Sequence, residues 1–279
     1  YYLYQTKDGL FQMIPWDLDN SFVGAIMGWD YWSPQNVYEY DPYFTGPPLG
    51  GAQPWEERPL LYKLLDDPFY RKLYTAHIRT IVNESLDTNL IRTNITQLQN
   101  LGSLAASQDQ HKDFTMSQYY DNVESAIWTG WGFGGIMSTI DARKEYLLNH
   151  PEISLSAPLL SNINVLNNFV TINVINANKV ELMATTNDYN SKFKSYIMYD
   201  DGMNGDMLAN DGVFTSQLPF SNTSQKIKFY IRAQNNDALT VFPERAEYEF
   251  FEYSPIMGLS DNTLVPVKNL IEIIDVLGR

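Results

Sequence analysis

The sequence predicts an α+β multidomain chain in which a helical first half is followed by a β-rich second half. Apolar residues recur at helical spacing up to about residue 150 and in short alternating runs beyond it. A length of 279 residues corresponds to about two domains. With 44% hydrophobic and 14% aromatic residues, the chain has enough apolar surface for a core in each.

The chain opens with a predicted β-hairpin that leads to two aspartates. Residues 1–5 and 10–16 are the expected strands, and residues 6–9 carry the Asp-Gly turn signal. Side chains alternate along an extended chain, so Asp17 and Asp19 leave on one face, where they can share a cation such as Mg²⁺. The alternative is a strand-ending turn, because Asp side chains also bond to nearby backbone N–H groups.

This region resembles the CotH family, the spore-coat protein H-like atypical protein kinases. The residues that carry the resemblance are Tyr1-Tyr2-Leu3-Tyr4, Pro15-Trp16-Asp17-Leu18-Asp19-Asn20-Ser21-Phe22, Arg58-Pro59-Leu60-Leu61, Asp67-Pro68-Phe69-Tyr70-Arg71 and Ile140-Asp141-Ala142-Arg143. They extend over about residues 1–150. One departure is visible, because the family places Gly directly after the Phe, whereas Val23 intervenes here before Gly24.

The resemblance implies a kinase-like C-terminal lobe over residues 1–153. It implies that Asp17 and Asp19 hold the Mg²⁺ that bridges the phosphates of ATP, with Asp17 in the role of the DFG aspartate. In kinases the base Asp, a metal-binding Asn and a Lys–Glu pair precede this point, so they are expected upstream of Tyr1 in roughly 200 further residues. The parent is then expected to phosphorylate protein hydroxyls, and this chain alone to be inactive.

The segment from residue 23 to residue 55 is rich in Gly, Pro and aromatic residues. Its aromatics are Trp29, Tyr31, Trp32, Tyr38, Tyr40, Tyr43, Phe44 and Trp55. By position it corresponds to a kinase activation and substrate-binding segment, with Trp29, Tyr31 and Trp32 as candidate substrate contacts. The alternative is that the aromatics anchor the loop onto the helical body. The same aromatics support a second hypothesis for function, a non-catalytic adhesion or glycan-binding protein with a vestigial kinase-like lobe.

Helices are predicted for the rest of the first half. Asp67 and Pro68 supply an N-cap and a proline at the first helical position, and Pro151 ends the last helix. The expected helices cover residues 59–65, 67–82, 90–104, 117–128 and 138–149. The second of them carries an apolar stripe that predicts a core face, formed by Phe69, Tyr70, Leu73, Tyr74, Ile78, Ile81 and Val82.

The second half, residues 154–254, is predicted to be a β-sandwich. Pro158 marks the change of pattern, and short strands separated by Asn, Asp and Gly turns follow it. Seven such strands suggest an immunoglobulin-like or fibronectin-like domain. They cover residues 159–166, 170–174, 179–184, 194–199, 213–218, 226–234 and 246–251.

One turn of this domain concentrates oxygen ligands. They are Asp200, Asp201, Asn204, Asp206, Asn210 and Asp211. The spacing is similar to an Asp-Asp-Gly…Gly-Asp…Asp-Gly segment of bacterial surface sandwiches that follow CotH-like domains. Oxygens this close together can supply the six or more ligands that Ca²⁺ takes. The alternative is a structural turn, because Asp-Gly and Asn-Gly steps provide positive-φ positions.

Residues 255–279 are predicted to be a linker and a truncated sorting segment. Residues 270–279 resemble the strand that opens a Bacteroidetes type IX secretion sorting domain, and the alternative is an ordinary edge strand or helix. The resemblance implies an extracellular or cell-surface protein. Its partner would be a protein substrate or a surface ligand.

Composition excludes several other functions. A net charge of −14 without any run of Lys and Arg disfavours nucleic acid. The absence of cysteine excludes disulfides, thiolate metal sites and a cysteine nucleophile. His77, His111 and His150 lie too far apart in sequence to predict a zinc site. No apolar run approaches the 18 residues typical of a membrane-spanning helix.

Overall fold

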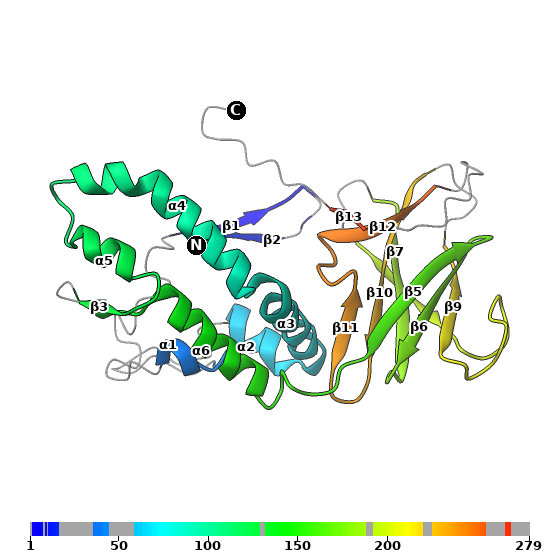
Figure 1. Ribbon diagram of the computed structural model, residues 1–279. Helices are drawn as coiled ribbons and strands as arrows, with labels where there is room; N and C mark the ends of the chain where they lie inside the picture. Colours follow the sequence, from blue (N-terminus) through cyan, green and yellow to red (C-terminus); the bar gives the residue numbers. More distant parts are fainter. Residues whose placement is uncertain are drawn as a thin grey trace. The chain divides into compact units, whose positions relative to one another are not determined.

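The computed structural model describes residues 2–7, 9, 11–16, 36–44, 59–128, 132–187, 192–219, 225–254 and 266–268. They form a mixed α and β chain with several sheets (Figure 1). The chain divides into two compact units, one mainly of Phe11–Tyr74 and Ile78–Ser154 and the other mainly of Leu155–Arg279. Each unit has its own hydrophobic core. Among the described residues, no helix combines the length and apolar character that crossing a bilayer requires.

The predicted N-terminal hairpin is confirmed. Strands β1 (Tyr2–Gln5) and β2 (Phe11–Ile14) form a two-stranded sheet. Their turn is closed by the amide of Gly9, which donates to the carbonyl oxygen of Thr6 at 3.0 Å. Just beyond β2, the ring of Trp16 meets the ring of Tyr2 edge to face, with centroids 5.8 Å apart. The described part of this region therefore consists of the hairpin and the two residues after it, and it ends at Trp16.

Three helices of the first unit, α3, α4 and α5, begin at polar caps. Asp67 accepts from the amides of Phe69 and Tyr70, at 2.8 and 3.2 Å, and so caps α3 as predicted. Asp87 caps α4, and Thr115 and Gln118 form a capping box on α5. The elements are α1 (Asn36–Glu39), α2 (Pro59–Asp66), α3 (Pro68–Thr80), the π-helical turn η3 (Ile81–Ser85), α4 (Thr88–Gln108), α5 (Met116–Asp121) and α6 (Ile136–Asn149).

The helix predicted over residues 117–128 is wrong in its second half. Helix α5 ends at Asp121, and Ile127–Trp128 is strand β3, which pairs with β4 (Gly132–Phe133). The side-chain amide of Asn122 donates to the carbonyl oxygens of Ser125 and Gly134, at 3.1 and 3.0 Å. These bonds hold the chain in a turn, so the helix stops despite its apolar spacing.

The core of the first unit uses only part of the apolar stripe predicted for residues 67–82, which form α3 and the start of η3. Ile78 and Val82 are buried, whereas Tyr70, Tyr74 and Ile81 are exposed. The other members of this core come from distant segments, because the buried cluster consists of Tyr43, Leu65, Ile78, Val82, Leu147 and Ile153. Helical periodicity alone does not reveal which side of such a stripe is covered.

Two arginines of α3 form hydrogen bonds with the last residues of the first unit. Arg71 on α3 makes a two-pronged pair with Glu152, in which its Nε lies 2.6 Å from Oε2, and its guanidinium lies 4.4 Å from the ring centroid of Tyr43. Arg79 donates through Nε to the carbonyl oxygen of Ile153 at 2.8 Å. Tyr43 is thus packed in the core, which fits the anchoring alternative for that one aromatic of the segment.

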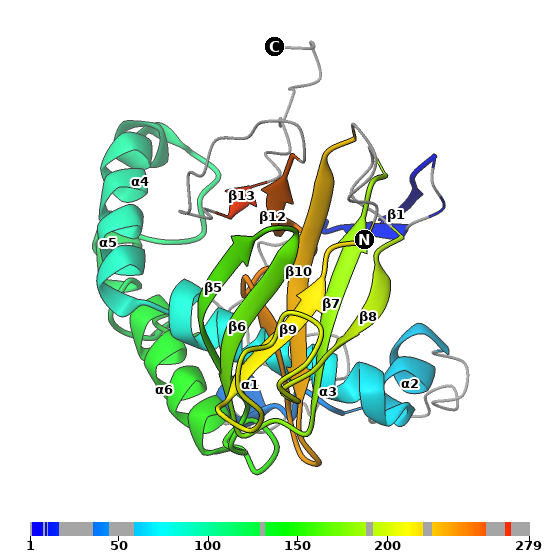
Figure 2. The same ribbon diagram turned by 90° about the vertical axis from the view of Figure 1, so that its right-hand side faces the viewer.

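The second unit contains two antiparallel sheets (Figures 1 and 2). The first has the order β5 (Leu159–Leu166), β6 (Phe169–Ile175), β9 (Val213–Gln217). The second has the order β13 (Val267–Lys268), β12 (Glu249–Tyr253), β10 (Ile227–Gln234), β7 (Lys179–Thr185), β8 (Lys194–Met198), and β11 (Leu239–Phe242) also pairs with β10.

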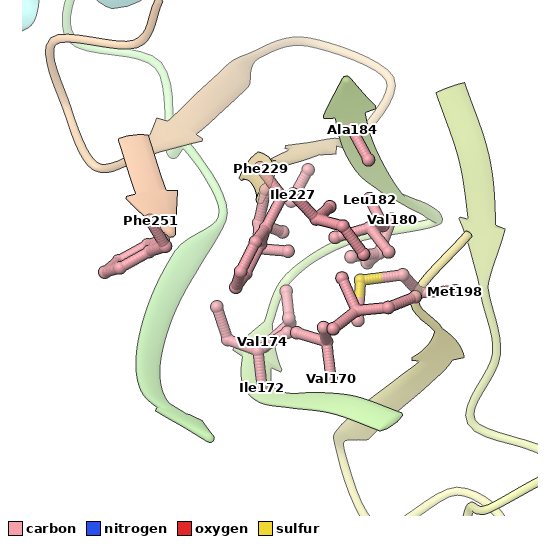
Figure 3. Packing of buried hydrophobic residues seen from close by; sticks show 13 residues of the cluster. Val170, Ile172, Val174, Val180, Leu182, Ala184, Met198, Ile227, Phe229 and Phe251 are labelled. Carbon is pink, nitrogen blue, oxygen red and sulfur yellow. The ribbon is translucent and has the colours of Figure 1, made fainter. Parts of the chain in front are cut away.

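One hydrophobic core lies between these sheets. Alternate residues of β6, β7 and β10 point into it, as period-two burial requires (Figure 3). They include Val170, Ile172, Val174, Val180, Leu182, Ala184, Ile227, Phe229 and Ile231, with Phe251 from β12 and Met198 from β8. Two sheets that share a core satisfy what a sandwich requires, while the immunoglobulin-like arrangement stays a prediction.

The strand predictions missed β11 and misplaced β12, and the predicted linker over residues 255–279 contains a further strand, β13, which pairs with β12. The predicted strand over 246–251 is β12 at Glu249–Tyr253, and the buried Ala246 lies in the turn before it. Strand β11 follows a turn in which Oδ1 of Asn235 accepts from the amides of Asp237 and Ala238, at 2.9 and 2.7 Å. An Asn-Asn-Asp run between two apolar runs was the available hairpin signal.

Candidate functional site

The residues predicted to hold magnesium and substrate lie outside the described part of the chain. These are Asp17 and Asp19 for the metal, and Trp29, Tyr31 and Trp32 for the substrate. The structure does describe the hairpin that precedes Asp17, up to Trp16. The candidate site with described geometry is therefore the Asp-rich turn between β8 and β9.

Three carboxylates converge in this turn. One oxygen each from Asp200, Asp206 and Asp211 lies within 4.8 Å of the others. Asp206 is buried, with 8% of its surface exposed, while Asp200 is half-buried and Asp211 is exposed. A set of carboxylate oxygens suits a hard cation such as Ca²⁺.

The same carboxylates also hold the turn together. Asp200 accepts from the amides of Asp211 and Gly212, at 3.1 and 3.0 Å. Asp206 accepts from the amide of Gly202 at 2.6 Å. These bonds support the structural-turn alternative, yet each carboxylate has more lone-pair sites than these bonds use.

Asp201 lies outside this group of converging carboxylates. Asp201 accepts from the amide of Met203 at 2.9 Å, which is a local turn bond. Asn204 and Asn210 have φ angles of 51° and 60°, a left-handed backbone that Asn tolerates, and their part in binding an ion stays a prediction. The sequence therefore identified the turn correctly but could not separate the three converging aspartates from their neighbours.

Gly205 lies where this turn packs against Phe169 of the first sheet. Its φ is +100°, and a Cβ built on it would lie 2.4 Å from Cδ1 of Phe169 on β6. Contact at that distance requires the Phe169 ring to move. Gly212, at the end of the same turn, also has a positive φ of +83°, but its Cβ would meet only the carbonyl oxygen of Val174, at 3.4 Å.

We expect Gly205→Ala to lower the free energy of unfolding by about 1–3 kcal/mol more than Gly212→Ala does. Both variants force an alanine into a positive φ, and only the first adds a steric clash with the ring. Urea denaturation followed by far-UV circular dichroism measures both values. Equal losses for the two variants would show that the turn does not rest on Phe169 in solution.

A charged cluster on the other sheet was not predicted from the sequence. Glu181 on β7 and Arg232 on β10 are direct cross-strand partners, and the carboxylate accepts from the guanidinium at 2.9 Å. Lys179 and Ser195 also bind Glu181, at 2.8 and 2.5 Å. Burial alone raises the pKa of Glu181, but these hydrogen bonds and the charge of Arg232 outweigh it and lower the pKa. The sequence signal that could have indicated this pair was a Glu and an Arg inside two predicted strands.

Comparison with known proteins gives a family match for the first part of the chain only. No curated protein and no solved structure matches the chain. One family model, described as CotH kinase protein, matches residues 1–129. The match includes the β1–β2 hairpin and the Asp17–Asp19 motif, but ends before Ile140–Arg143, where a further resemblance was expected. Over its first 129 residues, the chain is thus similar to the CotH kinase protein family.

Proposed function

We propose that the parent protein is a CotH-like protein kinase that transfers the γ-phosphoryl group of ATP to protein hydroxyls. The family match over residues 1–129 carries this proposal. The observed hairpin supports it, because two short strands also lead to the metal-binding Asp in protein kinases. The aromatic segment that follows, with Trp29, Tyr31 and Trp32, is proposed to contact the protein substrate.

In this proposal, Asp17 and Asp19 hold the Mg²⁺ that accompanies ATP. Two carboxylates one residue apart are a donor set that fits this ion. Bound Mg²⁺ supplies positive charge to the phosphates, and Asp17 has the DFG-like role. A base Asp, a second metal-binding Asn and a Lys–Glu pair complete such a site in kinases. None of those roles is assigned to a residue of this chain, so we expect the chain alone not to catalyse the transfer.

Calorimetry of the full-length parent tests the kinase proposal. We expect nucleotide binding that requires Mg²⁺ and that is lost in Asp17→Ala, together with about a 100-fold or larger drop in phosphoryl transfer. The matched control is Asp66→Ala, which removes an exposed carboxylate at the end of α2. Nucleotide binding that is unchanged in Asp17→Ala would exclude the proposed metal role.

The second hypothesis, a surface adhesion or glycan-binding protein, stays a prediction. Four of the eight aromatics that motivate it, Trp29, Tyr31, Trp32 and Trp55, lie outside the described residues. Glycan binding by the parent that is indifferent to Asp17→Ala, with no nucleotide binding, would favour it over the kinase. In either case, we propose an extracellular or surface location, with residues 154–254 as an immunoglobulin-like or fibronectin-like domain to which Val267–Lys268 adds an edge strand, and residues 270–279 as a sorting segment.

We also propose that Ca²⁺ binds at the Asp-rich turn of the second unit. The convergence of Asp200, Asp206 and Asp211 supports this proposal. We expect millimolar CaCl₂ to raise the melting temperature of the chain by about 2–8 °C relative to EDTA, because a ligand that binds only the folded state stabilises it. Asp206→Asn should abolish the shift, and Asp237→Asn, an exposed carboxylate elsewhere in the unit, should not. Identical melting temperatures in CaCl₂ and EDTA would leave the structural turn as the role of these residues.

A further inference from the structure

Helix α1 lies beside α6, and the chain that leaves α1 is held by its backbone (Figure 1). Arg143 on α6 is half-buried and donates through Nη1 to the carbonyl oxygen of Tyr38 at 3.1 Å, and also to that of Tyr40. These carbonyls lie at and just after the end of α1, where carbonyls have no intrahelical donor. A guanidinium suits this place, because its charge strengthens the hydrogen bonds that it donates.

A third carbonyl of the same segment is bound by a side chain of α3. The hydroxyl of Tyr74 donates to the carbonyl oxygen of Pro42 at 3.1 Å, and the Tyr74 ring meets the ring of Tyr43 edge to face, with centroids 5.8 Å apart. Two helices thus hold one short segment through backbone groups. What we call the carbonyl clamp consists of Arg143, Tyr74 and the carbonyls of Tyr38, Tyr40 and Pro42.

The side chains of the clamped segment are fixed as well. Tyr43 is 5% exposed, and its ring lies against that of His150, with centroids 5.1 Å apart. The carboxylate of Asp41 accepts from the amide of Tyr43 at 2.8 Å, and Nε2 of His150 lies 3.6 Å from the same carboxylate. The carbonyl oxygen of Asp41 accepts from the amide of Phe44 at 3.1 Å. Residues 38–44 therefore have a defined position within the first unit.

The clamped residues belong to the aromatic segment, residues 23–55, that is proposed to contact the protein substrate. Trp32 stands four residues before Asn36, and four residues span at most about 14 Å. Holding the backbone from α1 onward therefore confines the chain on which the proposed substrate contacts lie. Arg143 itself lies beyond residue 129, where the family match ends.

We infer that Arg143 and Tyr74 are positioning residues for the protein substrate, because by holding the backbone of residues 38–42 they set where the aromatic segment meets that substrate. The inference rests on the proposed kinase function. In this role neither side chain contacts the reacting atoms, since both act through the segment. Loss of either donor therefore weakens binding of the protein substrate and leaves the phosphoryl transfer step unchanged.

Steady-state kinetics of the full-length parent test this inference, with ATP, Mg²⁺ and dephosphorylated casein as the protein acceptor. We expect Arg143→Ala to raise the KM for casein about 10-fold, while kcat and the KM for ATP stay unchanged. Tyr74→Phe keeps the ring and loses only the hydroxyl, so it should raise the KM for casein about 2–5-fold. Arg143→Lys keeps a charged donor and should recover part of the loss.

Arg79→Ala is the matched control for these kinetics. Arg79 is also half-buried and also donates to two backbone carbonyls, those of Ile153 and Glu152, at 2.8 and 3.1 Å. It should lower stability without raising the KM for casein. Equal KM values for Arg143→Ala and Arg79→Ala, with transfer intact, would overturn the positioning role. A wild-type parent that transfers no phosphate would instead overturn the proposed function, and the positioning role with it.

Hydrogen exchange of the complete chain, followed by mass spectrometry, tests the carbonyl clamp independently of catalysis. Peptides that cover residues 38–44 should exchange faster in Arg143→Ala and Tyr74→Phe than in Arg79→Ala, because only the first two variants release this segment. Peptides from α4 should exchange at the wild-type rate in both clamp variants, which shows that the unit remains folded. Equal exchange of residues 38–44 in all three variants would show that the clamp does not hold the segment, and would overturn the inference.

Discussion

Glu181→Ala is expected to lower the unfolding free energy of the second unit by about 3–5 kcal/mol. The Glu181 side chain is 5% exposed and that of Arg232 is 14% exposed, so the two charges lie out of water. Removing the carboxylate takes away the cross-strand, hydrogen-bonded partner of a largely buried guanidinium. The loss reflects the removal of one member of a buried pair rather than the net strength of that pair.

Two further variants test whether burial of the charges causes the large loss of unfolding free energy in Glu181→Ala. Glu252 on β12 pairs with Lys226 at 2.7 Å, but the lysine is 53% exposed, so Glu252→Ala should cost less than about 1 kcal/mol. The double variant Glu181→Leu/Arg232→Leu should lose less than Glu181→Ala, because it removes both charges together. Urea denaturation measures all three. A Glu181→Ala loss no larger than that of Glu252→Ala would contradict the buried-pair interpretation.

The same pair gives a pH dependence of defined sign. The pKa of Glu181 is below its ordinary value of 4.5 in the folded chain, so the unfolded chain takes up the proton first as the pH falls. The stabilisation is present above pH 4.5 and is lost as the pH falls through the lower, folded pKa. Stability measured between pH 7 and about 3 should therefore fall less steeply in Glu181→Ala than in the wild type.

Phe229→Ala is the second substitution with a large expected effect, a loss of about 3–5 kcal/mol. Phe229 is fully buried between the two sheets, and its ring centroid lies 5.6 Å from that of Phe251 (Figure 3). Alanine leaves a cavity there, because strands on both sides limit how far the core can collapse. Phe229→Leu nearly conserves volume and should cost less than about 1.5 kcal/mol.

The six tryptophans help to assign this effect, because all of them lie between residues 16 and 131. Tryptophan fluorescence therefore follows the first unit, whereas far-UV circular dichroism follows both. We expect Phe229→Ala to shift the dichroism transition to lower urea more than the fluorescence transition. A Phe229→Ala loss equal to that of Phe229→Leu would show that the site repacks instead of leaving a cavity.

Features fixed by neighbouring residues were predictable from the sequence. The hairpin follows from its Asp-Gly turn, and the start of α3 follows from Asp67 and Pro68, because each depends on contacts within a few residues. The end of α5 was not predictable, since Asn122 bonds to Gly134, twelve residues away. Likewise, the exposed positions of the α3 stripe depend on what packs against the helix, which its period does not specify.

The candidate calcium site shows the same division between local and distant causes. Its residue types and its turn were readable from Asp, Asn and Gly at short spacing. Which carboxylates converge was not, because Asp201 accepts from the amide of Met203 while Asp206 is buried. That difference depends on the path of the turn between Asn204 and Asn210 and on Phe169, which lies more than 30 residues earlier.

The arginine contacts of α3 have a consequence for where this protein can be divided. The family match ends at residue 129, but the first unit is completed by later residues. Leu147 and Ile153 belong to its core, and Glu152 receives Arg71. Cutting the chain where the family match ends would separate these partners and leave a buried cluster open to water. The physical end of the unit is at about residue 154, where the last of these contacts has been made.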